Sequence, residues 1–261
     1  MSRAAVLVLN WNGWADTLEC LESLFRSLPE DCPVLVCDNG SSDGSMEKLL
    51  AWARGDLDVF LPIGHPLRER SWPPLEKPLS HVLLNREEAD QFGGDSAPAR
   101  LTLVQTGENL GFAGGNNVGL RLLLQQRGCE YVWILNNDTV VAPGAMEALL
   151  CRMEERPDAG ICGSTILRYG APQRAQVLGG AWYCTWLGLP WELGRLRRSG
   201  DKIAAARVER WMSYVSGTSL FVRRSLLEEV GLMSEDYFLY YEGLDGAMRS
   251  RGRFALAYAP E

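Results

Sequence analysis

The sequence has few of the residues that build metal clusters or catalytic triads. It contains only two histidines, His65 and His81, and its seven cysteines show no CxxC or other metal-ligand spacing. A zinc site and a Ser-His-Asp triad are therefore not expected. The odd number of cysteines, set in apolar surroundings, indicates reduced thiols, as in a cytosolic protein.

A basic excess and a long hydrophobic run are also missing. The formal net charge of -7 argues against a nucleic-acid partner, because a surface that follows phosphates needs a basic excess. No stretch approaches the roughly 20 apolar residues of a membrane span, and the apolar run Ala4–Leu9 is too short for a signal peptide. We therefore expect a cytoplasmic protein that meets a membrane only at its surface, on the inner face.

Apolar runs and helical spacings alternate along the first part of the chain. The runs Ala5–Leu9, Val34–Cys37 and Tyr131–Leu135 have the continuity of buried parallel strands. Between them, leucines recur at helical spacing. This βαβα succession predicts an α/β fold with a mostly parallel central sheet and helices on both faces.

Prolines and glycines between residues 60 and 100 break this rhythm. Six prolines, among them Pro98, and the pair Gly93-Gly94 predict an irregular insertion at the periphery. Apart from this insertion we expect a single domain over residues 1–261, made of two halves, 1–140 and 141–261.

Polar side chains follow three of the predicted strands. In an open parallel sheet, ligands bind beyond the carboxyl ends of the strands. We therefore expect these side chains to converge on one crevice. They are Asn10, Asn12, Asp38, Asn39, Asn136, Asn137 and Asp138.

Asp138 is the most informative of these residues. A carboxylate at the end of a buried strand suits Mg²⁺ or Mn²⁺, which prefer oxygen ligands and keep positions open for phosphate oxygens. Asp38 could accept a hydrogen bond from a nucleobase N–H. Taken alone, each aspartate also fits ordinary turn chemistry, Asp138 before Pro143 and Asp38 in the turn-rich segment that follows it.

The segment Asn109–Asn117 is rich in glycine and leads into a predicted helix. Glycine allows close approach of the backbone, and the free N–H groups of a helix start attract phosphate, so Asn109, Gly114 and Asn117 are candidate ligand-binding residues. The spacing is not G-x-G-x-x-G, which excludes the dinucleotide fingerprint. A tight turn packed against a neighbouring strand explains the glycines equally well.

Two carboxylates, Glu242 and Asp245, stand three residues apart at the start of another predicted helix and share one of its faces. A carboxylate at a helix N-terminus stays ionised, as a general base must. A pair that only stabilises the first turn is the alternative.

Tryptophan and arginine are concentrated between residues 182 and 211. They are consistent with a lip that faces an acceptor or a membrane, or with aromatic side chains that complete a core over a sheet. The residues are Trp182, Trp186, Trp191, Trp211, Arg195, Arg197 and Arg198.

Taken together, six segments in this order resemble the family 2 glycosyltransferases, and most closely the rhamnosyltransferase-like members of bacterial polysaccharide synthesis. No single segment is decisive, but the ordered set covers nearly the whole chain except the insertion. The matching segments are Val8–Asn12, Val36–Gly44, Asn109–Asn117, Leu135–Thr139, Val215–Gly217 and Tyr240–Glu242.

The resemblance implies a GT-A fold and inverting transfer of a sugar from a nucleotide-diphosphate donor, a dTDP- or UDP-sugar such as dTDP-rhamnose. The acceptor would be a hydroxyl of a saccharide or of a lipid-linked saccharide. Residues 1–140 would bind the donor, residues 141–261 the acceptor, and the cofactor would be Mg²⁺ or Mn²⁺.

The resemblance also implies roles for individual residues. Asp38 would contact the nucleobase, and Asn137 would lie near the ribose or the ion. Asp138 would bind the ion in a DxD-like motif whose first acid is replaced by Asn136. Glu242 would be the base, and Ser216 and Gly217 would line the sugar or acceptor pocket.

The sequence departs from the family in two places. Gly243 stands where the family usually has a second acid, which puts the orientation of the base in question. The family continues after the position of Pro260 into a segment with a histidine that supplies a further metal ligand. A catalytically impaired sugar-nucleotide-binding protein is therefore the alternative.

Two other enzyme classes fit the sequence less well. A nucleotidyltransferase is disfavoured because Asn10–Gly13 lacks the cations that bind a triphosphate, and an oxidoreductase lacks its fingerprint.

Overall fold

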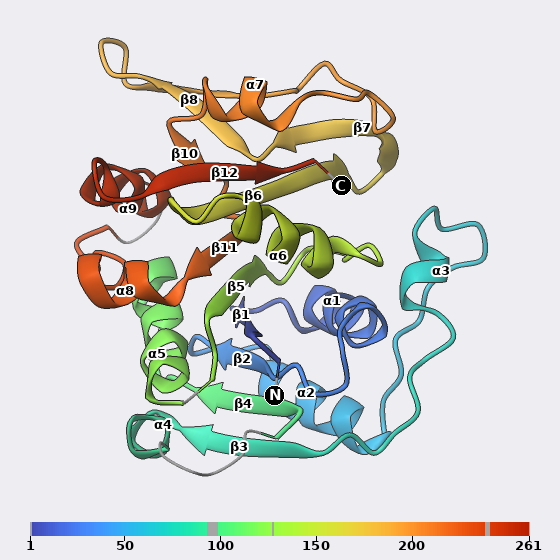
Figure 1. Cartoon of the computed structure of the whole chain (residues 1–261). Helices are drawn as coiled ribbons and strands as arrows, with labels where there is room; N and C mark the ends of the chain where they lie inside the picture. The colour runs from blue at the N-terminus through green and yellow to red at the C-terminus, as the bar shows by residue number, and fades with distance from the viewer. Residues whose placement is uncertain (1, 93–98, 127, 238–240, 261) are drawn as a thin grey trace.

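The computed structural model describes residues 2–92, 99–126, 128–237 and 241–260; Gly93, Gly94, Pro98 and Tyr240 lie outside them. Over the described residues, nine strands form one mixed sheet. Eight of them follow the order β12-β6-β11-β5-β1-β2-β4-β3, and β7 pairs with β6 (Figure 1).

Five strands from the first half of the chain form a continuous parallel run in the sheet. Nearly every residue of its three central strands is buried, as expected for strands covered on both faces. Because the strands are parallel, their carboxyl ends meet at one edge, where Asn10 lies in register with Asp38. The strands are β1 (Ala4–Asn10), β2 (Val34–Asp38), β3 (His81–Asn85), β4 (Leu101–Gln105) and β5 (Tyr131–Asn136).

The second half of the chain extends this sheet and builds a smaller one. β11 runs antiparallel to both β5 and β6, and β12 runs parallel to β6. The extending strands are β6 (Ala159–Arg168), β7 (Ala171–Leu178), β11 (Ser219–Arg223) and β12 (Ala255–Ala259). The smaller sheet has the order β10-β8-β9 and consists of β8 (Gly180–Cys184), β9 (Leu189–Glu192) and β10 (Tyr214–Val215).

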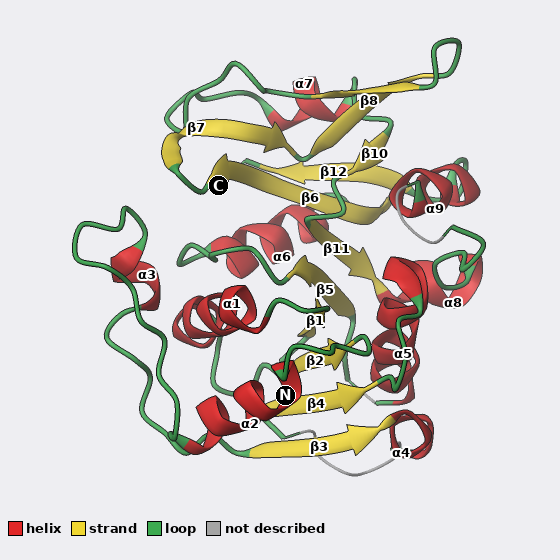
Figure 2. Cartoon of the chain, turned by 180° about the vertical axis from the view of Figure 1, so that it is seen from behind, coloured by secondary structure: helices red, strands yellow, loops and turns green. Residues whose placement is uncertain are grey.

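Helices cover both faces of the main sheet (Figure 2). Alternate residues of β1 point to opposite faces, so Val6 packs in one core and Leu7 in the other. The first core is completed by α1 (Trp14–Ser27), α2 (Ser45–Arg54) and α6 (Ala145–Glu155). The second is completed by α4 (Arg86–Gln91), α5 (Gly111–Gln125), α7 (Ala205–Glu209) and α8 (Arg224–Val230). The α/β fold class expected from the sequence is confirmed.

The prediction of an irregular insertion over residues 60–100 is wrong in part. Residues His81–Asn85 form β3, an edge strand parallel to β4. α4 follows at once from a capping box, in which Asn85 and Glu88 each accept a hydrogen bond from the other's backbone N–H. The strand is short and only Leu84 in it is buried, so it lacks the continuous apolar run of the central strands. The short helix α3 (Arg68–Ser71) also lies in this segment.

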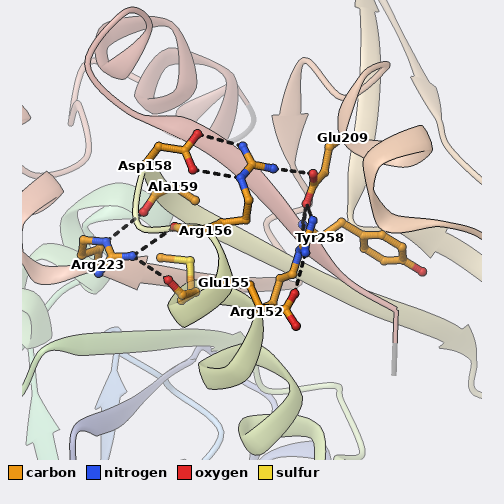
Figure 3. A network of polar contacts seen from close by, with 9 residues as sticks. Arg152, Glu155, Arg156, Asp158, Ala159, Glu209, Arg223 and Tyr258 are labelled. Atoms are coloured by element: carbon orange, nitrogen blue, oxygen red, sulfur yellow. Dashed lines mark hydrogen bonds and ion pairs between the residues drawn. The ribbon is translucent and has the colours of Figure 1, made fainter.

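A cluster of arginines and acids ties α7 to the main sheet (Figure 3). The carboxylate of Glu209 accepts hydrogen bonds from Arg152 and Arg156, at the end of α6 and just beyond it, and from the backbone N–H of Tyr258 in β12 at 2.9 Å. Through Glu209, this cluster holds α7, which connects β9 and β10 of the small sheet, against α6 and the main sheet.

Neither membrane spans nor disulfides occur in what the structure describes. No helix among the described residues has the length and apolarity to cross a bilayer. All seven cysteines, each of them described, are free thiols, in agreement with the expectation of reduced cysteines.

The close packing of α5 on the sheet leads to a first prediction. A Cβ atom at Gly119 would lie 2.4 Å from Leu7 Cδ1 and 3.0 Å from Cys37 Sγ. Gly119→Ala should therefore lower the free energy of unfolding by about 1–3 kcal/mol through overpacking. Urea denaturation measures this. Gly246→Ala is the matched control, since a Cβ there meets no atom within 4 Å, and it should stabilise its helix by up to about 1 kcal/mol. Equal stability of the two variants would contradict the packing argument.

Candidate functional site

The side chains at the ends of β1 and β2 form a buried network with Asn137, which follows β5. Asn10 Nδ2 donates to Asp38 Oδ1 at 2.6 Å, and Asn10 Oδ1 accepts from Thr17 Oγ1 at 2.8 Å. Asn137 Nδ2 donates to the same Thr17 Oγ1 at 3.0 Å. The structure thus brings together Asn10, Asp38 and Asn137, which the sequence placed at three separate strand ends.

Asn12 and Asn39 shape the loops around this network. Asn12 has a left-handed backbone with φ of 51°, and its Oδ1 accepts from Ser42 N at 2.8 Å. Asn39 Nδ2 donates at 3.0 Å to Asn109 Oδ1 and at 3.0 Å to Gly111 O. Asn39 therefore links the end of β2 to the start of α5, with Asn109 as its partner.

The glycine-rich segment lies mostly inside a helix. α5 begins at Gly111, so Gly114 and Asn117 are helical residues. A Cβ at Gly115 would come within 2.6 Å of Leu9 Cδ1, which means that this glycine lets α5 approach β1. Gly115 therefore packs against a neighbouring strand, which is the alternative that the sequence left open for these glycines.

Asn117 is committed to a different contact. It is buried, its Nδ2 donates to Met233 O at 2.9 Å and to Glu235 Oε1 at 2.8 Å, and its Oδ1 accepts from Met233 N at 3.1 Å. Asn117 therefore fixes the segment that leads towards Glu242. Neither Gly114 nor Asn117 lines the cavity described next.

A cavity of about 490 Å³ opens between the end of β5, the small sheet and α9 (Glu242–Ser250). Asn136 lines it from β5, Ser216 and Gly217 line it from the turn between β10 and β11, and Glu242 lines it from α9. The sequence had marked all four positions, which come from three separate motifs.

One face of the small sheet forms another wall of the cavity. Ala181 pairs with Glu192 and Tyr183 pairs with Pro190 across β8 and β9, and all four residues line the cavity. Glu192 is a second cavity carboxylate that the sequence analysis missed. Nothing near it in the sequence marks it, because only the pairing of β9 with β8 brings it to the cavity.

Glu242 is the first residue of α9 and is 5% exposed. Its Oε1 is buried and has no hydrogen-bond partner among the described residues. Burial raises the pKa of its carboxyl group. The place of Glu242 at a helix start favours the ionised form, and burial acts in the opposite direction on its pKa.

The backbone before Glu242 is held in an unusual conformation. Tyr241 has a φ of 66°, in the left-handed region, and its ring packs edge-on against Tyr183 with 6.4 Å between ring centroids. Such a conformation in a non-glycine residue costs about 1–3 kcal/mol and is concentrated at functional sites. The strain lies at the residue that sets the direction of the Glu242 side chain.

Asp245 and Gly243 have structural tasks in α9. Asp245 Oδ2 accepts from Arg249 Nε at 2.6 Å, and Arg249 also donates to the carbonyl oxygens of Val230 and Leu232. Asp245 does not line the cavity, and a catalytic role for it beside Glu242 stays a prediction. A Cβ at Gly243 would lie 3.3 Å from Val215 O, so glycine there allows α9 to pack closely on β10.

Asp138 lies two residues beyond Asn136 in the turn after β5 and is exposed. Its carboxylate has no hydrogen bond or ion pair with the rest of the described chain, and it does not line the cavity. The described residues contain no group of three or more His, Cys, Asp or Glu that could hold a metal ion. Mg²⁺ commonly uses one or two carboxylates and completes its shell with phosphate oxygens and water. The exposed Asp138 carboxylate, which has no partner in the described chain, could be one such carboxylate ligand.

Two proteins that are similar to this chain in sequence are named as enzymes that transfer sugars. The chain is 28% identical over 206 residues to an N-acetylglucosaminyl-diphospho-decaprenol L-rhamnosyltransferase of Mycobacterium tuberculosis, covering 71% of this chain and 65% of the relative. It is 24% identical over 152 residues to the low-salt glycan biosynthesis hexosyltransferase Agl10 of Haloferax volcanii, covering 57% and 45%. The matches thus span less than two thirds of the length of these relatives.

Solved structures share the fold. The mannosyltransferase PcManGT from Pyrobaculum calidifontis, in complex with GDP-Man and Mn²⁺, has a TM-score of 0.56 at 17% identity over 97% of this chain and 53% of its own. TarS 1-349 of S. aureus has a TM-score of 0.54 at 15% identity over 98% and 60%. The model of Glycosyl transferase family 2 matches residues 86–231, more than half of the chain. The chain belongs to this family and has the GT-A fold expected from the sequence.

Proposed function

We propose that the protein transfers a sugar from a nucleoside-diphosphate donor to an acceptor hydroxyl, with inversion at the anomeric carbon. The observation that carries this proposal is the buried Glu242 carboxyl group in the cavity wall, with one oxygen that has no partner in the described chain. An unsatisfied buried carboxylate destabilises a fold. An acceptor hydroxyl in the cavity would supply the missing hydrogen bond.

The reaction at this carboxylate is a single displacement. The acceptor oxygen attacks the anomeric carbon, and its proton moves to Glu242. The bond from that carbon to the diphosphate breaks, and the electron pair leaves with the diphosphate. A base works best when its pKa lies near the working pH, and the pKa of Glu242 is shifted in that direction by burial.

We propose that the donor nucleotide lies over the ends of β1 and β2. Asp38, held by Asn10 and Ser41, would accept from the base, while Asn12, Asn39 and Asn109 shape the surrounding loops. Gly114 is a helical residue and the Asn117 amide is hydrogen-bonded to Met233 and Glu235, so the proposal does not depend on direct donor contacts by these two residues. Ser216 and Gly217 would contact the transferred sugar or the acceptor.

Asp138, with Asn136 and Asn137 beside it, would hold Mg²⁺ or Mn²⁺. The ion would offset the negative charge that develops on the departing diphosphate. The Mn²⁺ in the complex of PcManGT supports this choice of cofactor.

The relatives guide the choice of substrates. The name of the mycobacterial relative specifies a rhamnosyl donor and a lipid-linked N-acetylglucosaminyl acceptor. We propose a dTDP- or UDP-sugar donor, with dTDP-rhamnose as the first candidate, and a saccharide or lipid-linked saccharide acceptor in polysaccharide synthesis.

A panel of nucleotide sugars tests the proposal. With Mn²⁺ and donor at about 100 times its Kd, binding should stabilise the fold by about 2.7 kcal/mol, which is about 5–10 °C in Tm for a chain of this size. One nucleotide class should give this shift, and adding acceptor should release the nucleoside diphosphate. A Tm that no nucleotide sugar moves would contradict the proposal.

The impaired sugar-binding protein is distinguished by the same panel, because it would give the Tm shift without release of nucleoside diphosphate. The structure weakens the main reason for that alternative. Gly243 has a packing role against β10, and Glu242 keeps its place in the cavity without a neighbouring acid.

A further inference from the structure

The hairpin of β8 and β9 carries a group of exposed apolar side chains. Trp186 and Leu187, in the turn, are 96% and 71% exposed, and Trp182 and Trp191 are 42% and 71% exposed. Leu189 is also exposed. We call these five residues the hairpin apolar face. The sequence left open that these tryptophans complete a core over a sheet. Their exposure rules out that alternative.

The hairpin apolar face is separate from the cavity. Trp182 pairs with Trp191, one residue away from the pairs Ala181–Glu192 and Tyr183–Pro190 that line the cavity. Because successive side chains in a strand point to opposite faces, the tryptophans lie on the side of the small sheet turned away from the cavity. A partner bound to them would leave the cavity face free.

The hairpin projects from the body of the molecule. Figures 1 and 2 show the turn after β8 extending beyond the neighbouring helices. The chain returns to the body through α7, where Glu209 is fixed by Arg152 and Arg156. The projection is therefore anchored at its base, and its tip is accessible.

The segment that holds the hairpin has the opposite charge to the whole chain. Residues 171–214 contain seven Lys or Arg and three Asp or Glu, whereas the chain has a net charge of -7. Arg195, Arg197 and Arg198 follow the hairpin directly, are exposed, and form no ion pair with described residues. An acidic protein thus concentrates cations in the segment that follows the exposed tryptophans of the hairpin and pairs with β7 through the backbone of Arg197 and Arg198.

We propose that the hairpin apolar face and the neighbouring arginines dock on the surface of an anionic lipid bilayer. Tryptophan is enriched where one end of a side chain lies in hydrocarbon and the other in water. Arginine is attracted by the negative potential of anionic lipid headgroups. Apolar and basic groups together give the two signals that stable peripheral binding requires. The acidic remainder of the chain is repelled by the same surface, which orients the protein with its hairpin towards the lipid.

Sedimentation of the full chain with vesicles tests the proposal. The protein should bind vesicles of phosphatidylcholine and phosphatidylglycerol at low salt, and bind phosphatidylcholine alone at least about tenfold more weakly. Trp186→Ser should lower binding by about tenfold or more through lost apolar contact. Arg195→Gln and Arg198→Gln should each lower it by about fivefold.

The matched controls lie elsewhere on the surface. Ile63, 97% exposed, stands in the segment before α3, away from the hairpin tip (Figures 1 and 2). Ile63→Ser and Arg70→Gln should bind vesicles as the native protein does. These experiments change no cavity residue, so their outcome is independent of the proposed reaction.

Three results would overturn the proposal. The first is no binding to the anionic vesicles. The second is a dimer in solution that Trp186→Ser dissociates, which would make the hairpin apolar face a contact between copies of the chain. The third is equally tight binding to soluble dextran sulfate that Trp186→Ser leaves unchanged, which would show attraction to polyanions without lipid.

Discussion

Glu242→Gln should lose about 10²–10⁴-fold in transfer rate while it binds the nucleotide sugar as tightly as the native protein. The amide keeps the shape of the side chain in the cavity wall but cannot take the proton of the acceptor hydroxyl. Single-turnover release of nucleoside diphosphate measures the rate, and calorimetry measures donor binding. Transfer at the native rate in this variant would place the base elsewhere.

The pH dependence gives an independent test of the same role. Because burial raises the pKa of the Glu242 carboxyl group, the native rate should fall as the pH drops through that raised value, where the base becomes protonated. The residual rate of Glu242→Gln should not show this acid limb. Asp245→Asn is the matched control, since it makes the same chemical change three residues along α9 in a carboxylate that is paired with Arg249 and lies outside the cavity. It should keep the acid limb.

Stability separates loss of the base from loss of the fold. A carboxyl group with a raised pKa in the folded state binds more protons folded than unfolded, so its contribution to stability decreases as the pH rises from the unfolded to the folded pKa. Removing the charge should therefore make Glu242→Gln at least as stable as the native protein above that range, with the difference vanishing at acid pH. Thermal unfolding across pH measures it. A Tm well below the native value at neutral pH would mean that the lost rate reflects damage to the fold.

The central sheet and the strand-end network follow from local patterns in the sequence. Continuous apolar runs that stop at Asn10, Asp38 and Asn136 indicate buried parallel strands, and parallel strands bring their ends to one edge. The hydrogen bond from Asn10 to Asp38 is the direct consequence. The edge strand β3 was missed because an edge position needs neither a long run nor full burial.

The cavity could be predicted only in part. Glu242, Ser216 and Gly217 stood out as motif residues, but Glu192 and Tyr183 reach the cavity through the pairing of β8 with β9, which no local pattern specifies. The same limit applies to Asn117. Its amide is used up by Met233 and Glu235, more than a hundred residues away in sequence.

The largest remaining effect is expected at Asp138. Asp138→Asn should weaken Mn²⁺ binding in the presence of donor by at least about a hundredfold, because it removes the negative charge from a side chain that binds the ion directly. Mutation of residues that only hydrogen-bond to metal ligands already costs about 10–100-fold in metal affinity. Free Mn²⁺ measured by its electron paramagnetic resonance signal reports this without any turnover.

The control for Asp138→Asn is Asp56→Asn, another exposed aspartate, just after α2, which should leave Mn²⁺ binding unchanged. The structure makes the test sharp, because the Asp138 carboxylate has no partner in the described chain whose loss would disturb the fold. A weakened donor complex with an unchanged Tm of the free protein would then report on the ion and not on the fold. Native Mn²⁺ and donor affinity in Asp138→Asn would instead leave this aspartate as a turn residue before Pro143, and the proposed ion would need other oxygen ligands at the strand ends.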